Sequence, residues 1–190
     1  MEAIKKIDLN KISKIILISI LGTILLTISA KVKISLGPVP QTMQTFVVLF
    51  LGIAFGSKVG FITVSLYLFE GIFGLPVFSG TPEKGIGLIY FTGPTMGYLI
   101  GFLVATYVAG KFEYKDIFKT PFLGFFINYL KLLVAVSFIY LLGLMWLGSL
   151  IGWDKPVFKF GAEPFLLAES LKIFILTILA GKISKLRNII

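Results

Sequence analysis

Six long apolar stretches dominate the sequence, and the connections between them hold most of its lysines. The prolines lie in these connections or at the start of a stretch. A helix needs about 20 residues to cross the hydrocarbon of a bilayer, and fewer where the bilayer thins around it. The stretches that meet this requirement cover residues 12–30, 41–55, 59–75, 94–110, 122–149 and 164–181. The second and third are short and are joined by Gly56-Ser57-Lys58, so we predict that they form one helical hairpin. The pattern predicts an all-α integral membrane protein, a compact bundle of six transmembrane helices.

The overall composition agrees with a membrane protein. Hydrophobic residues make up 57% of the 190 positions and charged residues 14%, whereas soluble domains carry about 25% charged residues. A soluble domain of this length could not bury so much apolar surface. Disorder is excluded too, because 15% of the residues are aromatic and disordered chains are poor in aromatic residues. We therefore predict a single transmembrane domain over residues 1–190.

The basic residues predict how the chain is oriented in the membrane. The chain has a net charge of +9, and cytoplasmic connections carry an excess of Lys and Arg. The N-terminal segment, the connections at Lys58 and at 111–119, and the C-terminal tail hold more basic residues than the alternate connections do. Both termini are therefore predicted to be cytoplasmic, in a multi-pass protein of the cytoplasmic membrane. Because the lysines alternate with apolar stretches, we expect membrane lipids as partners and no nucleic acid.

The residue types that are missing argue against an enzyme. The sequence contains no Cys and no His, which excludes a thiolate nucleophile, a Cys or His metal site and an imidazole proton shuttle. It contains no P-loop motif and no paired carboxylates on neighbouring stretches for acid–base work. We therefore expect no catalytic residue, no metal and no cofactor. A small membrane enzyme and a structural or assembly protein remain as alternatives.

The connections on the predicted outer side are long enough to be functional. The connection from Gly74 to Gly93 is rich in Gly, Pro, Ser and Thr but keeps several aromatic and aliphatic residues. Long connections in compact domains are usually functional or disordered, and the apolar residues here favour an ordered lid. A second ordered loop is predicted between Gly148 and Glu163.

Polar residues that enter the predicted helices from the outer side suggest a binding pocket. Three stretches begin near Pro38, Pro94 and Pro164. At about 1.5 Å per helical residue, the side chains predicted at a similar depth below the outer face are Gln44, Tyr98, Glu169 and Lys172. Charged groups inside a bilayer must face partners or a wet cavity. The sequence therefore predicts an outward-facing pocket.

The predicted pocket suits a particular kind of ligand. Glu169 and Lys172 are spaced i, i+3 and share a helix face, so one alternative is an ion pair that serves only structure. A carboxylate, an ammonium and an amide among apolar walls suit a mostly apolar small molecule with a neutral donor–acceptor group. Lys84, in the predicted lid, suits a terminal acid.

Four sequence blocks resemble those of a known family. They are Leu36-Gly37-Pro38-Val39-Pro40-Gln41-Thr42-Met43-Gln44-Thr45, Gly74-Leu75-Pro76-Val77-Phe78, Gly93-Pro94-Thr95-Met96-Gly97-Tyr98-Leu99-Ile100-Gly101-Phe102, and Pro164-Phe165-Leu166 before Glu169-Ser170-Leu171-Lys172. Together these blocks resemble the BioY family of biotin-specific substrate-binding (S) components of energy-coupling-factor (ECF) transporters. The resemblance implies six transmembrane helices and an outward-facing biotin pocket that loops cover.

The resemblance also implies roles for individual residues. An Asp and a Lys three residues apart on the family's last helix hold the ureido ring, and these positions fall on Glu169 and Lys172. Glu replaces Asp here, so the ring is expected to lie slightly differently or the helix to shift. The family's pocket tyrosine falls on Tyr98, which is expected with Phe78 to surround the thiophane ring and alkyl chain. The valerate carboxylate is assigned to Lys84 on the basis of charge.

The function that the resemblance implies is biotin uptake, with biotin as the transported ligand and no cofactor. The implied partners are the transmembrane coupling subunit and the ATPase subunits of an ECF transporter. Ser19, Thr23 and Thr27 form a stripe of small residues that would suit either such docking or self-association. An S component for another vitamin is the alternative within the same class.

Overall fold

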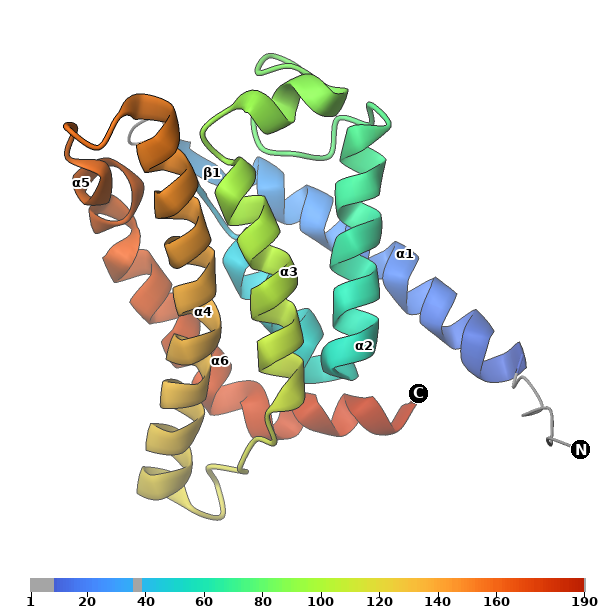
Figure 1. Ribbon diagram of the computed structural model, residues 1–190. Coiled ribbons are helices and arrows are strands. Elements are labelled where there is room, and N and C mark those ends of the chain that lie inside the picture. The colour runs from blue at the N-terminus through green and yellow to red at the C-terminus, as the bar shows by residue number, and fades with distance from the viewer. Residues whose placement is uncertain (1–8, 36–38, 190) are drawn as a thin grey trace, which may run out of the picture.

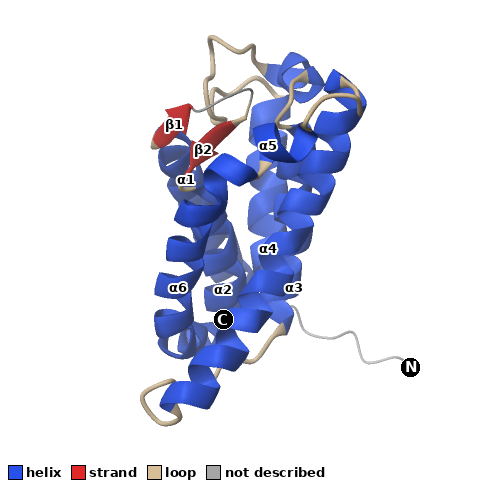
Figure 2. Ribbon diagram, turned by 90° about the vertical axis from the view of Figure 1, so that its left-hand side faces the viewer, coloured by secondary structure: helices blue, strands red, loops and turns tan. Residues whose placement is uncertain are grey.

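Long helices form the body of the protein, and loops and a short β-hairpin gather at one end of them (Figures 1 and 2). The computed structural model describes residues 9–35 and 39–189. Its α-helices are α1 (Leu9–Lys31), α2 (Gln44–Ile72), α3 (Met96–Lys111), α4 (Pro121–Ile151), α5 (Val157–Gly161) and α6 (Leu166–Ile183). The strands are β1 (Lys33–Ser35) and β2 (Pro40–Thr42), and the 3-10 helices are η1 (Gly87–Thr92), η2 (Glu163–Phe165) and η3 (Ser184–Ile189).

Several of these helices are suited to a membrane. α1, α2, α4 and the C-terminal helical run Val157–Ile189 are long and apolar enough to cross one. α3 is apolar but has 16 residues, or about 24 Å at 1.5 Å per residue, which is shorter than the hydrocarbon core of about 30 Å. The prediction of a helical membrane protein is therefore confirmed.

α2 consists of two helical segments that meet at Gly56. This residue has φ 78° and ψ 173°, a backbone conformation that glycine adopts without strain. The segments 44–55 and 57–72 pack closely, since a Cβ on Gly60 would lie 3.2 Å from the Cα of Gly52. α2 thus corresponds to the predicted hairpin, and the chain turns back at Gly56 (Figure 1).

The predicted start of the second apolar stretch was wrong. Residues 40–42 are not helical but form β2, which pairs antiparallel with β1 in the register Lys33↔Thr42. Pro40 restricts the residue before it to extended conformations, and the pairing with β1 continues the extended backbone as far as Thr42. The helix begins at Gln44, which therefore lies in the first turn rather than six residues inside a helix.

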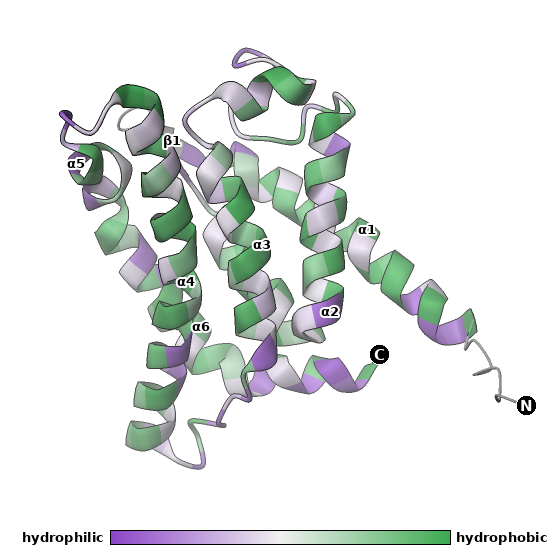
Figure 3. Cartoon of the chain, in the orientation of Figure 1, coloured by the Kyte–Doolittle hydropathy of each residue, from purple (hydrophilic) through white to green (hydrophobic). Residues whose placement is uncertain are grey.

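α2 lies at the centre of the bundle, and α1 and α4 lie at its edges. Buried residues make up 61% of the most apolar window of α2, against 28% for α1 and 33% for α4. The outward faces of α1 and α4 are mostly hydrophobic (Figure 3). The predicted small-residue stripe is not free for a partner, because Ser19 and Thr23 are buried and the Thr63 hydroxyl donates to Ser19 Oγ at 3.2 Å.

Candidate functional site

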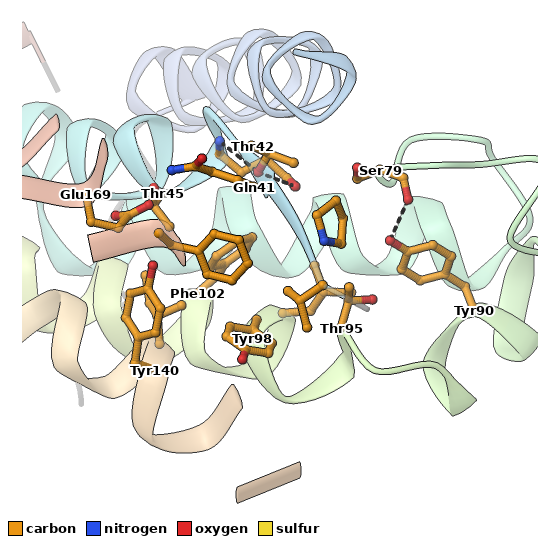
Figure 4. Close-up of a pocket in the computed structure, with 16 residues that line it drawn as sticks. Gln41, Thr42, Thr45, Ser79, Tyr90, Thr95, Tyr98, Phe102, Tyr140 and Glu169 are labelled. Carbon is orange, nitrogen blue, oxygen red and sulfur yellow. Dashed lines mark hydrogen bonds between the residues drawn. The ribbon is translucent and has the colours of Figure 1, made fainter. Parts of the chain in front are cut away.

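A cavity lies between the helices at the end that carries the loops and the β-hairpin. Its empty space, counted together with the solvent at its open mouth, is about 520 Å³. Elements far apart in the sequence contribute to its wall (Figure 4). The lining residues are Val39, Pro40, Gln41, Thr42, Gln44, Thr45, Ser79, Tyr90, Thr95, Tyr98, Leu99, Phe102, Ile139, Tyr140, Phe165 and Glu169.

Glu169 and Lys172 form a buried ion pair on α6. Lys172 Nζ lies 2.7 Å from Glu169 Oε1, and Thr45 on α2 connects the two, donating to Oε1 at 2.9 Å and accepting from Nζ at 3.0 Å. Lys172 Nζ also donates to the backbone oxygen of Thr42 at 2.6 Å. An ammonium has three hydrogens, and these contacts supply an acceptor for each. Lys172 itself does not line the cavity.

Glu169 keeps one oxygen open. Its Oε2 is buried and accepts no hydrogen bond from any described residue. A buried polar atom without a partner is costly, and more so if it is charged. The Tyr140 hydroxyl on α4 points toward this carboxylate (Figure 4) and interacts with it, although the geometry at Oε2 does not meet the criteria for a hydrogen bond. The wall of the cavity therefore contains an acceptor that is ready for a donor.

Two further unpartnered polar atoms belong to the same wall. Over residues 9–35 and 39–189, four buried side-chain polar atoms lack a partner, and three of them belong to Gln41, Ser79 and Glu169, which all line the cavity. Gln41 contributes its amide nitrogen and Ser79 its hydroxyl. Glu169 and Ser79 lie toward opposite ends of the lining residues (Figure 4). Unpartnered polar atoms concentrated in this way indicate a ligand site.

Aromatic side chains form much of the rest of the wall. Tyr98 and Tyr140 pack edge to face with ring centroids 6.1 Å apart, and the Tyr98 hydroxyl donates to the Gly161 carbonyl at 2.8 Å. Phe102 and Phe165 are buried. Burial also raises the pKa of Tyr90 above its ordinary value, so its hydroxyl stays protonated and donates to the Ser79 carbonyl at 2.8 Å.

The six predicted site residues do not all reach the cavity. Glu169, Tyr98 and Gln44 line it, whereas Lys172, Phe78 and Lys84 do not. The amide of Gln44 is engaged, since Nε2 donates to the Tyr67 hydroxyl at 2.8 Å and Oε1 accepts from Thr42 at 3.1 Å.

Phe78 and Lys84 have other surroundings in the loop between α2 and α3. Phe78 is 1% exposed and packs against Tyr67, Tyr90 and Phe91, with ring centroids 4.7–5.4 Å apart. Lys84 is exposed to solvent.

Sequence reasoning missed Gln41, Ser79 and Tyr140 as site residues. Gln41 and Ser79 offered a signal, because Gln41 lies inside the first family-like block and Ser79 directly follows the second. Tyr140 offered none, since it is one aromatic residue in a long apolar stretch.

Comparisons with known proteins agree with this fold. The model of the BioY family matches residues 3–188. The "Probable biotin transporter BioY" of Pyrococcus horikoshii is 35% identical over 84% of this chain and 89% of its own. The "Biotin transporter BioY" of Thermotoga maritima is 32% identical over 86% and 92%. A crystal structure of the S-component for biotin from an ECF-type ABC transporter has the same fold, with a TM-score of 0.74, 24% identity and coverage of 94% of this chain and 95% of that one.

Proposed function

Because the chain belongs to the BioY family, we propose that it takes up biotin across the cytoplasmic membrane as the S component of an ECF-type transporter. It is a multi-pass membrane protein that binds its ligand and passes it on unchanged, and it is not an enzyme. One observation carries the proposal for this chain: the buried, unpartnered Oε2 of Glu169 in the wall of a largely apolar cavity.

The ureido ring of biotin suits this end of the cavity. The ring has two N–H donors, and Glu169 Oε2 accepts one of them without giving up any existing contact. The ring carbonyl needs a donor, and the free amide hydrogens of Gln41 supply one. The ion pair with Lys172 fixes the orientation of Glu169. For Lys172 to donate to the carbonyl directly, it must first exchange one of its three present contacts.

The rest of biotin fits the remainder of the wall. Tyr98, Phe102 and Phe165 surround the thiophane ring and alkyl chain, because burying apolar surface against them is favourable. The valerate carboxylate accepts from the free Ser79 hydroxyl at the opposite end from Glu169. Lys84, exposed on the same loop, attracts the acid through its charge rather than by lining the site.

The arrangement in the membrane is part of the same proposal. Each segment of α2 crosses the bilayer, so that α1, 44–55, 57–72, α3, α4 and α6 make six spans with lipid around them and both termini in the cytoplasm. The break at Gly56 supports this count. A transmembrane coupling subunit with its ATPase subunits supplies the energy. Self-association is the alternative, although the burial of Ser19 and Thr23 removes the small-residue stripe as its surface.

Equilibrium binding of labelled biotin to the purified full-length protein tests this function. Glu169→Gln keeps the shape of the side chain but removes its charge, so we expect Kd to rise by about 10- to 100-fold, the worth of one hydrogen bond to a charged group. Glu163→Gln is the matched control, because Glu163 is exposed at the start of the same helical run.

Two results would refute the proposal. Absence of biotin binding by the wild type, or displacement of biotin by thiamine, riboflavin or pantothenate at equal concentration, would contradict biotin as the ligand. Equal affinities of Glu169→Gln and Glu163→Gln would contradict the site.

A further inference from the structure

The segment from Pro76 to Thr81 covers one end of the cavity and is held by side chains from three other elements. We call this segment the roof. Its Ser79 lines the cavity, and its backbone oxygens accept hydrogen bonds from residues outside the segment. The donors are Tyr67 of α2 to Val77 (3.0 Å), Tyr90 of η1 to Ser79 (2.8 Å), and Lys31 of α1 to Pro76, Phe78 and Thr81.

Lys31 makes the most of these contacts. Its Nζ lies 2.8 Å from the backbone oxygen of Pro76, 3.0 Å from that of Phe78 and 3.3 Å from that of Thr81. It also lies 3.1 Å from the Thr81 hydroxyl oxygen. The three hydrogens of the ammonium are thus shared among four oxygens of the roof, and hydrogen bonds with a charged donor are roughly twice as strong as neutral ones.

These contacts join the end of α1 to a segment far along the chain. Lys31 is the last residue of α1, a helix at the edge of the bundle, and its partners lie 45 to 50 residues further along. Figure 1 shows this end of α1 beneath the loop between α2 and α3. Phe78 and Val77 of the roof are buried, so the segment is fixed from below by packing and from the side by Lys31.

We propose that Lys31 is a positioning residue that keeps the roof closed over the cavity and so sets the lifetime of the bound ligand. The inference rests on the proposed function, because the ligand is biotin. A ligand leaves the cavity only when the wall that covers it moves. Removing the ammonium leaves the backbone oxygens of Pro76 and Thr81 without this donor and leaves that of Phe78 with the Thr81 hydroxyl at 2.8 Å. This loss favours the open roof and speeds dissociation.

Dissociation of labelled biotin from the full-length protein, chased with excess unlabelled biotin, provides the first measurement. In Lys31→Met, which cannot donate, we expect the dissociation rate to rise about tenfold, equivalent to about 1.4 kcal/mol, and the association rate to change less than threefold.

Lys31→Arg keeps a charged donor and should restore most of the lifetime. Lys33→Met is the matched control, since it removes the same charge two residues away and no described hydrogen bond or ion pair joins Lys33 to the roof. Thr81→Val removes one of the four oxygens, together with the bond from the Thr81 hydroxyl to the Phe78 carbonyl at 2.8 Å, without touching α1. We expect a smaller increase.

Hydrogen exchange in the ligand-free protein provides a measurement that needs no biotin. The roof and its continuation contain bonded amides at Val77, Thr81 and Lys84. We expect them to exchange faster in Lys31→Met and at the wild-type rate in Lys33→Met, while amides of α3 remain unchanged in both.

Each outcome decides a different point. Equal dissociation rates for Lys31→Met and Lys33→Met overturn the proposal, even if exchange in the roof differs. If Lys31→Met does not fold, a wild-type dissociation rate in Thr81→Val overturns it. If the wild type binds no biotin, the proposed function fails. Hydrogen exchange of the roof amides then decides whether Lys31 holds the roof. Faster exchange in Lys31→Met but not in Lys33→Met supports this role, and unchanged exchange in Lys31→Met refutes it.

Discussion

Thr45→Val tests whether biotin binding depends on the orientation of the Glu169 carboxylate. The Thr45 hydroxyl donates to Glu169 Oε1 at 2.9 Å and accepts from Lys172 Nζ at 3.0 Å. Valine has nearly the same shape but does neither. The carboxylate then keeps only its contact with Lys172 at 2.7 Å, and it can rotate so that Oε2 leaves the cavity.

The expected magnitude follows from the contacts that are lost. A hydrogen bond to a charged group contributes about 1.5–3 kcal/mol, and two are removed. Lys172 retains Thr42 and Glu169 as acceptors, so we count only the bond to the carboxylate. Turning Oε2 back toward the ligand then costs about 1.5–3 kcal/mol, which raises the Kd for biotin by roughly 10- to 150-fold.

The assay is equilibrium binding of labelled biotin, with thermal unfolding of the ligand-free protein measured in parallel. Thr177→Val is the control, because Thr177 is fully buried on α6 and its hydroxyl donates only within its own helix, to Ile173 at 2.7 Å. We expect the control to bind as the wild type does. A Kd for Thr45→Val within threefold of the control would show that the threonine bridge does not orient the carboxylate.

Two further predictions concern the acid end of the ligand and the packing of the bundle. Ser79→Ala should weaken binding of biotin by about tenfold, one hydrogen bond to a charged acceptor, but should leave binding of biotin methyl ester nearly unchanged; equal losses for both ligands would place the acid elsewhere. Gly52→Val should lower the unfolding temperature by about 5 °C or more, because a Cβ there meets the backbone oxygen of Thr106 on α3, whereas Ser65→Val, half-buried in the same helix, should change it little. An unfolding temperature of Gly52→Val equal to that of Ser65→Val would mean that α2 and α3 can separate without cost.

Apolar length and residue spacing predicted the parts of this protein that depend on local sequence. The length of the apolar stretches predicted a helical membrane protein, and the i, i+3 spacing placed Glu169 and Lys172 on one helix face, where they form an ion pair. Spacing along a helix does not predict which of two side chains on the same face reaches a cavity. Glu169 therefore lines the cavity, whereas Lys172, one turn further, turns its hydrogens toward Thr42 and Thr45.

Other features depend on contacts between distant segments. Lys84 was chosen for its charge in a loop, but composition does not determine the path of a loop, and the side chain lies exposed. Lys31 had no signal in the sequence, because its importance comes from oxygens 45 to 50 residues away. β2 replaced the first residues of a predicted helix, since the apolar count outweighed the effect of Pro40 on the residue before it.

The ion pair between Lys172 and Glu169 determines how the membrane potential acts on this part of the protein. One ammonium and one carboxylate bonded to each other carry no net charge, and a ureido ring adds none. The charge at this depth is therefore the same in the empty and the loaded protein. A transmembrane voltage does work only on net charge that moves across the field, so the cell's membrane potential neither drives nor opposes the movement of this part of the site.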